Sequence, residues 1–313
     1  MENNRANDYP EYDEEIDFKE IFIALWNKKA IISIITLAFA IFSVFYALSL
    51  PNIYSSNAVL APSSESSSIS SKLGGLSSIA GLAGVSLPSD SSSPSVEAIE
   101  RMQSFDFFSK YILPNIQVEN LLAFESWSPN INKILYDEDI YNITSKKWVR
   151  KVKPPKFVKP SDQEAYMAFK KIFSVTQNKK NSYVNISIKH QSPYVAKKWA
   201  DLVILNINES MRDEKRQLAQ NSIIFLNEKS SLANLASIRK ATSQLIENQI
   251  QNLMMISANK DYIFKTIDSP RVAEIKSSPN RAIICMSITF IGVVISLIIA
   301  LMLHFLRKTE ELQ

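Results

Sequence analysis

The sequence is poor in glycine, cysteine and histidine. Its 313 residues include five Gly, one Cys and two His. One cysteine excludes an internal disulfide framework, and two histidines leave little for a metal centre. Four glycines, Gly74, Gly75, Gly81 and Gly84, lie within eleven residues, and the fifth is Gly292. This distribution disfavours folds that depend on glycine-rich nucleotide loops, such as Rossmann and P-loop folds.

Sequence motifs of catalysis are also missing. The chain contains no GxxxxGK[ST], HExxH, CxxC or GxSxG pattern. A Ser-His-Asp triad would need His190, because His304 lies in a long apolar run. His190 follows a predicted strand, and we expect an ordinary surface or cap residue there. The sequence therefore predicts no catalytic residue, no cofactor and no metal.

Two long apolar runs stand near the ends of the chain. Residues 30–50 and 282–306 contain no Asp, Glu, Lys or Arg, and each is long enough to cross about 30 Å of hydrocarbon. We expect both to be transmembrane helices. The alternative for the first run is a cleaved signal peptide, with Ala47-Leu48-Ser49 as a cleavage-like triplet. Its apolar part is longer than usual and follows 29 mostly polar residues, which favours an uncleaved span.

Basic residues near the first run predict the orientation. Lys28 and Lys29 precede it, whereas no Lys or Arg occurs between residues 51 and 71. By the positive-inside rule, the tails 1–29 and 307–313 are expected in the cytoplasm and residues 51–281 on the far side. That outer domain has 29 Lys+Arg and 21 Asp+Glu. The seven-residue second tail is too short for an output domain, which disfavours a receptor or histidine kinase.

The sequence of the outer domain predicts a mixture of strands and helices, that is, an α+β fold. Alternating or short apolar patterns predict strands at 54–60, 183–189 and 264–270. Helical spacing predicts helices at 96–113 and 161–173, the second capped by Ser161 or Asp162, and another opening at Ser192-Pro193. Residues 115–160 look irregular. The segment 63–95 holds 15 Ser and four of the glycines, and predicts either a flexible loop or a small-residue element packed on a partner.

A very long helical region is expected over residues 193–260. From Tyr194 to Ser269 there is neither Gly nor Pro, so helix should be interrupted once or twice at most. Glu214, Asn221 and Glu228 occupy the companion register and exclude a clean two-stranded zipper. The apolar stripe therefore predicts lateral packing, either on its own domain or on neighbouring copies. One seven-residue register holds Ile204, Met211, Leu218, Phe225, Leu232, Ile246 and Leu253.

A basic stretch and two small-residue positions are further candidates. Residues 146–159 hold seven Lys/Arg and no acid, which suits either anionic phosphates and sugars or a solvated loop. Pro279, just before the second apolar run, and Gly292 within it are candidates for close packing of membrane helices. The basic patch proper consists of Lys146, Lys147, Arg150, Lys151 and Lys153.

The order of these segments resembles the Wzz polysaccharide co-polymerases, the bacterial O-antigen chain-length determinants. The resemblance covers nearly the whole chain. It is carried by EIDFKEIFIALWNKK leading into the first span, NIYSSNAVL after it, GGLSSIAGLAGVSL, the long Gly-free helix, and IDSPRVAEIKSSPNRA entering the second span.

The resemblance implies a non-enzymatic, homo-oligomeric protein of the bacterial inner membrane. It implies two spans, a membrane-proximal mixed α/β base and a very long protruding helix in the periplasm. The implied partners are further copies in a ring, a glycan polymerase that uses undecaprenyl-pyrophosphate-linked substrate, and the growing lipid-linked polysaccharide. The implied function is control of polysaccharide chain length.

Two other classes of function remain open from the residues alone. The first is a membrane-anchored periplasmic adaptor or sensor for polysaccharide export or secretion, although a typical adaptor has one span and a Gly-rich lipoyl-like domain. The second is a periplasmic enzyme, which would need a catalytic role for His190 or for carboxylates within 115–160.

Overall fold

The computed structural model describes residues 25–63, 93–232 and 236–310. Contacts divide them into two units: one holds the two long apolar helices, and the other is Asn52–Ser277. The tail 1–24, most of the Ser/Gly-rich segment 63–95 and the end of the chain lie outside the described residues.

The first unit is a pair of helices, α2 (Lys29–Ser49) and α10 (Arg281–Glu310), packed on each other. Both are long and apolar enough to cross a membrane, and their apolar surface is largely unburied within the unit. At 1.5 Å per residue, the 21 residues of α2 reach about 31 Å. Apolar side chains that cover a helix on all sides, without a core to receive them, suit a lipid surrounding.

The second unit is built on a four-stranded antiparallel sheet in the order β6-β7-β1-β8. β1 (Tyr54–Pro62) is an inner strand between β7 (Val184–His190) and β8 (Phe264–Asp268), and β6 (Phe173–Gln177) is an edge. The predicted strands at 54–60, 183–189 and 264–270 are thus confirmed. β6 was not predicted, because it follows a helix directly with no residue that signals a break.

The core forms where helices cover the sheet. α8 (Pro193–Leu232) packs on β1 and β7, and α7 (Asp162–Ile172) packs on β6 and β7. Ser161 accepts a hydrogen bond from the Glu164 amide at 3.3 Å, which confirms it as the cap of α7. The largest fully buried side chains include Trp199, Phe108, Phe264, Leu60, Ile186, Ile188 and Ile207.

The predicted helix over 96–113 is broken. Ser104 is extended (φ −79°, ψ 152°), and its hydroxyl accepts from the Phe107 amide at 3.2 Å. This side-chain bond caps a new helix that begins after Ser104. The apolar spacing therefore runs through the whole segment, although the helix itself is interrupted. The pieces are α4 (Pro94–Met102), α5 (Phe105–Phe107), a π turn (Phe108–Ile112) and a 3-10 turn (Leu113–Asn115).

Residues 115–160, expected to be irregular, contain short elements. Aromatic contacts hold them together, including a T-shaped pair of Tyr141 and Trp148 at 5.2 Å between ring centroids. The elements are α6 (Glu119–Leu122) and the hairpins β2 (Phe124–Ser128) with β3 (Lys133–Tyr136) and β4 (Tyr141–Asn142) with β5 (Lys147–Trp148).

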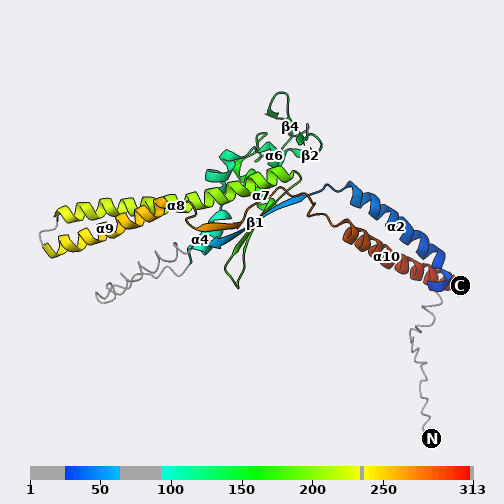
Figure 1. Ribbon diagram of the computed structural model, residues 1–313. Coiled ribbons are helices and arrows are strands. Elements are labelled where there is room, and N and C mark those ends of the chain that lie inside the picture. Colours follow the sequence, from blue (N-terminus) through cyan, green and yellow to red (C-terminus); the bar gives the residue numbers. More distant parts are fainter. Residues whose placement is uncertain (1–24, 64–92, 233–235, 311–313) are drawn as a thin grey trace, which may run out of the picture. The chain divides into compact units, whose positions relative to one another are not determined.

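The long helical region over 193–260 is a helical hairpin. α8 has 40 residues and spans about 60 Å, and α9 (Ala236–Ala258) returns beside it (Figure 1). Arg212 of α8 donates to the carbonyl of Asn259, just beyond α9, so the two helices are antiparallel. The fold class is confirmed as mixed α+β with a long helix and two candidate membrane helices. The region consists of two helices, within the one or two interruptions that the sequence allowed, and α9 packs on α8.

Candidate functional site

The hairpin carries an apolar groove between α8 and α9. Its cavity of about 410 Å³ is open to solvent. Leu218 and Phe225 are 52% and 57% exposed, although both are large apolar side chains. α9 covers α8 only in part, so these two side chains are available to a further surface. The groove is lined by Leu218, Asn221, Ser222, Phe225, Leu226, Leu245 and Gln249.

The predicted apolar stripe is divided by this hairpin. Ile204 and Met211 are buried in the domain core. Leu218 and Phe225 line the groove, and the side chain of Leu232 lies outside the described residues. Ile246 and Leu253 lie on α9 and are half-buried. The stripe therefore has a core part and a groove part, and its role in packing between copies stays a prediction.

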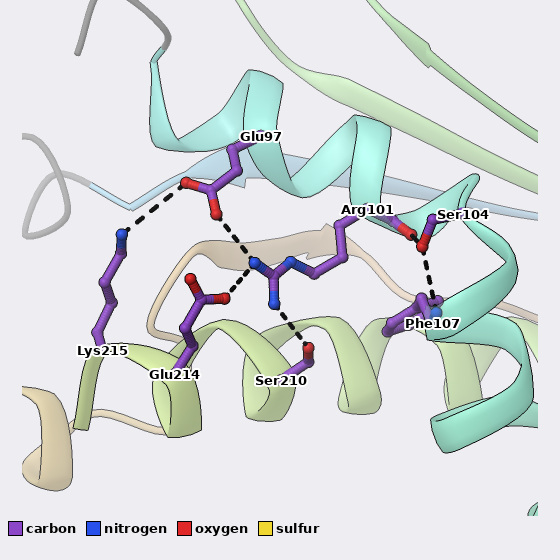
Figure 2. A network of polar contacts seen from close by, with 7 residues as sticks. All are labelled: Glu97, Arg101, Ser104, Phe107, Ser210, Glu214 and Lys215. Atoms are coloured by element: carbon purple, nitrogen blue, oxygen red, sulfur yellow. Dashed lines mark hydrogen bonds and ion pairs between the residues drawn. The ribbon is translucent and has the colours of Figure 1, made fainter. Parts of the chain in front are cut away.

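A network of charged side chains joins α4 to α8 next to the core (Figure 2). The Arg101 guanidinium donates to Glu97 at 3.0 Å, contacts the Glu214 carboxylate, and lies 3.4 Å from the Ser210 hydroxyl. Lys215 lies 3.9 Å from Glu97. One arginine thus links two carboxylates on different helices. Because its side chain is 26% exposed, each pair contributes on the order of 1 kcal/mol or less.

The network explains why a charged residue occupies one position of the companion register on α8. Glu214 occupies a position that is usually apolar in a two-stranded coiled coil, and in this fold it contacts Arg101 of α4. No sequence pattern indicates this ion pair, because α4 and α8 are far apart in the chain. Beside the network an open concavity is lined by Glu100, Asp106, Ser109, Lys110 and Tyr111 with other residues.

Asn208 is a buried polar residue that sequence reasoning missed. Its Oδ1 accepts hydrogen bonds from the amides of Ile263 and Phe264, both at 3.0 Å. Its Nδ2 donates to the Phe264 carbonyl at 3.1 Å. The Asn208 side chain therefore bonds the backbone of β8 much as a neighbouring strand would, and it links the start of β8 to α8. Asn208 is 5% exposed, so water does not replace these bonds.

His190 was expected to be a surface or cap residue; it is buried at 8% exposure, which contradicts the surface alternative. The Ser192 amide donates to its Nδ1 at 2.9 Å, and its Nε2 lies 2.9 Å from the Asn120 carbonyl oxygen. Since Nδ1 accepts, Nε2 carries the proton and donates. Burial lowers the pKa of His190, against the raising effect of these two backbone bonds. Both ring nitrogens are engaged by backbone, which leaves neither for a catalytic base.

The basic patch contains one arginine that is bonded within the domain and four lysines that are exposed. Arg150 donates to Glu164 at 2.5 Å and to the carbonyls of Phe157 and Val158 at 2.7 and 2.9 Å. These bonds hold the loop that follows Arg150 in place, so the guanidinium is used within the domain. Lys146, at the β4–β5 turn with φ 52°, is exposed. Lys147, Lys151 and Lys153 are exposed as well, and their role toward an anion stays a prediction.

Gly292 lies where α10 packs tightly against Phe39 of α2. A Cβ built on Gly292 would stand 2.5 Å from Phe39 Cβ and 2.6 Å from Phe39 Cγ. Such a contact is too short for any side chain, so the two helices pack closely here only because residue 292 has none. Pro279 precedes α10 and is not within it. Gly74, Gly75, Gly81 and Gly84, the candidate flexible or partner-binding glycines, lie outside the described residues.

Among the described residues, no cluster of His, Cys, Asp or Glu suits a metal ion. The free Cys285 lies in α10, 3.6 Å from the Ser43 carbonyl oxygen of α2.

Comparison with known proteins gives one family. Residues 14–113 match the family model described as "Wzz: Chain length determinant protein". The resemblance to this family is thereby confirmed over that part of the chain. No curated protein matches the sequence.

Two solved structures are among those that match the chain. A "full-length bacterial polysaccharide co-polymerase" is 14% identical, with 93% of this chain and 99% of that chain covered and a TM-score of 0.38. A fragment of WzzB, a polysaccharide co-polymerase from Salmonella Typhimurium, is 11% identical, with 72% of this chain and all of that chain covered and a TM-score of 0.34.

Proposed function

Because residues 14–113 match the Wzz family, we propose that this protein is a non-enzymatic regulator of polysaccharide chain length. The polysaccharide is lipopolysaccharide O-antigen, and the protein is an oligomeric scaffold of the inner membrane. It modulates a glycan polymerase that uses undecaprenyl-pyrophosphate-linked substrate. The family match is the observation that carries the proposal.

The two apolar helices support the proposed location. α2 and α10 flank the second unit in sequence and each is long enough for one span. With both tails in the cytoplasm, Asn52–Ser277 lies in the periplasm, where the polymer grows. The pair of lysines before α2, Lys28 and Lys29, supports this orientation.

Deletion of the gene tests the function. The strain without the protein should still make O-antigen, but with a broader distribution of lengths on a polysaccharide gel. Expression of the wild-type protein should restore the narrow distribution. If deletion abolished the polymer altogether, the protein would be needed for synthesis and the proposal would be wrong.

The groove on the hairpin supports the proposed assembly. Leu218 and Phe225 leave about half of their surface in water, and burying it against a second copy would contribute on the order of 1 kcal/mol each. A heterologous contact of this kind generates a ring if the rotation closes.

A pair of charge substitutions tests the assembly. Phe225→Asp should shift the detergent-purified protein from a large oligomer to smaller species, because a carboxylate does not pack in an apolar contact. Ile224→Asp is the matched control, since Ile224 is 66% exposed on the same helix but does not line the groove. If both variants and the wild type formed oligomers of equal size, the groove would not be part of the interface between copies.

Cross-linking tests the partner. A photo-reactive group on the outer domain should capture a glycan polymerase. Capture of a transporter instead would favour an export adaptor.

A further inference from the structure

The second unit has a single place from which both connections to the apolar helices leave. The amide and the hydroxyl of Ser277 both donate to the carbonyl of Ile53, at 2.8 and 3.1 Å. Ile53 follows the end of α2 by four residues, and Ser277 precedes the start of α10 by four. Four residues reach about 14 Å at most. Chain length alone therefore keeps this part of the domain close to the surface of any membrane that the two helices cross.

An aromatic cluster lies at this place. Tyr54, next to Ile53, makes a T-shaped contact with Trp127 at 5.7 Å between ring centroids. Trp127 also lies 6.2 Å from Tyr194, in the first turn of α8. Its indole N–H donates to Asn132 at 2.9 Å, which ties the β2–β3 turn to the cluster. Three amphipathic rings from β1, β2 and α8 are thus brought together beside the connections.

Large apolar side chains are exposed around the same place. Ile131, beside Asn132 in the β2–β3 turn, is 68% exposed. Ile275, two residues before Ser277, is 84% exposed, and Tyr194 is 49% exposed. Single exposed apolar residues are ordinary on a protein surface. These three, however, belong to the segments tied to the two connections, and exposed Lys133 and Lys276 lie beside them in sequence.

We propose that this part of the domain contacts the lipid headgroup layer, with Trp127, Ile131, Tyr194 and Ile275 as interfacial anchors. The proposal rests on α2 and α10 spanning a membrane. Trp and Tyr favour the membrane–water boundary, where a ring meets apolar chains and its polar atom meets water. The headgroup layer is about 5–7 Å thick on each side, which is the depth of a side chain. Lys133 and Lys276 add attraction to anionic headgroups.

Spin labels on the full-length protein in nanodiscs of zwitterionic and anionic phospholipid test the contact. Because Cys285 is the only cysteine, C285S provides a background for I131C and I275C. Oxygen concentrates near lipid, whereas a nickel chelate stays in water. We expect the ratio of oxygen to nickel collisions to be several-fold higher at positions 131 and 275 than at I224C. The control Ile224 is 66% exposed on α8, and the same ratio at all three positions would overturn the proposal.

Tryptophan fluorescence gives a second measurement that needs no label. Brominated lipids should quench part of the wild-type emission, and W127F should lose much of that quenchable part. W148F is the matched control, because Trp148 is also half-buried but lies on the β4–β5 hairpin. Equal loss of quenching in both variants would contradict the contact. Neither measurement depends on polysaccharide, so failure here is distinguishable from failure of the proposed function.

Discussion

Replacing Asn208 by alanine should weaken the domain strongly. The substitution leaves the amides of Ile263 and Phe264 without the Oδ1 acceptor, and these residues are 1% and 0% exposed. An unsatisfied buried donor costs about 1–3 kcal/mol, so two donors cost about 2–6 kcal/mol. A typical domain has about 5–15 kcal/mol of stability. Asn208→Ala should therefore remove a large fraction of it.

Asn206 is the matched control for this prediction. It is 7% exposed and lies two positions away on the same helix. Its amide donates only to the Leu202 carbonyl at 2.8 Å, within its own helix. Asn206→Ala leaves that carbonyl with its helical partner, so its cost should stay near 1 kcal/mol.

The assay is urea unfolding of the full-length protein in detergent, followed by tryptophan fluorescence. Trp199 is 2% exposed and reports on the core. We expect the midpoint of Asn208→Ala to fall well below that of Asn206→Ala, with little change in slope. If the two variants unfolded within about 0.5 kcal/mol of each other, the assignment of Asn208 as the fastening between α8 and β8 would be refuted.

Three further predictions concern the helix pair, the charged network and the buried histidine. Gly292→Leu should force α10 away from α2 and reduce the yield of folded protein in membranes, whereas Ile291→Leu, at a 53% exposed position, should not. Arg101→Met should leave Glu97 and Glu214 facing each other and lower the free energy of unfolding by about 1–2 kcal/mol, while Lys197→Met, which loses one exposed pair, should cost under about 0.5 kcal/mol. The pKa of His190 is lowered in the folded state, so the unfolded state binds more protons below about pH 6.5 and stability should fall as the pH drops through that range. His190→Gln should flatten this dependence in urea titrations between neutral and acidic pH, and an unchanged slope would contradict it.

Features that depend on local patterns were predictable from the sequence. Apolar runs located both candidate membrane helices, a short apolar segment located β1, and alternation located β7. Ser161 and the Ser192-Pro193 pair marked the starts of α7 and α8, because a cap is a short-range bond.

Features that depend on distant partners were not predictable. The return of the chain after Leu232 falls in a stretch without Gly or Pro, and only the packing of α9 on α8 reveals it. Asn208 looked like any polar helical residue, since its partners lie 55 and 56 residues further along. The burial of His190 was not predictable, because the covering aromatic rings of Phe124 and Trp199 come from other elements.

The place of β1 and β8 in the sheet has a mechanical consequence. β1 is held on both sides by β7 and β8, whereas β8 is an edge strand. The ends of these segments that lead to the apolar helices meet at the Ser277–Ile53 bonds. A lateral force that drew the two helices apart would load this junction first and then peel β8 from β1 one bond at a time, which needs less force than shearing a whole ladder at once. The sheet would therefore yield at the β8 edge and leave β1, β7 and the helical hairpin's attachment to them intact.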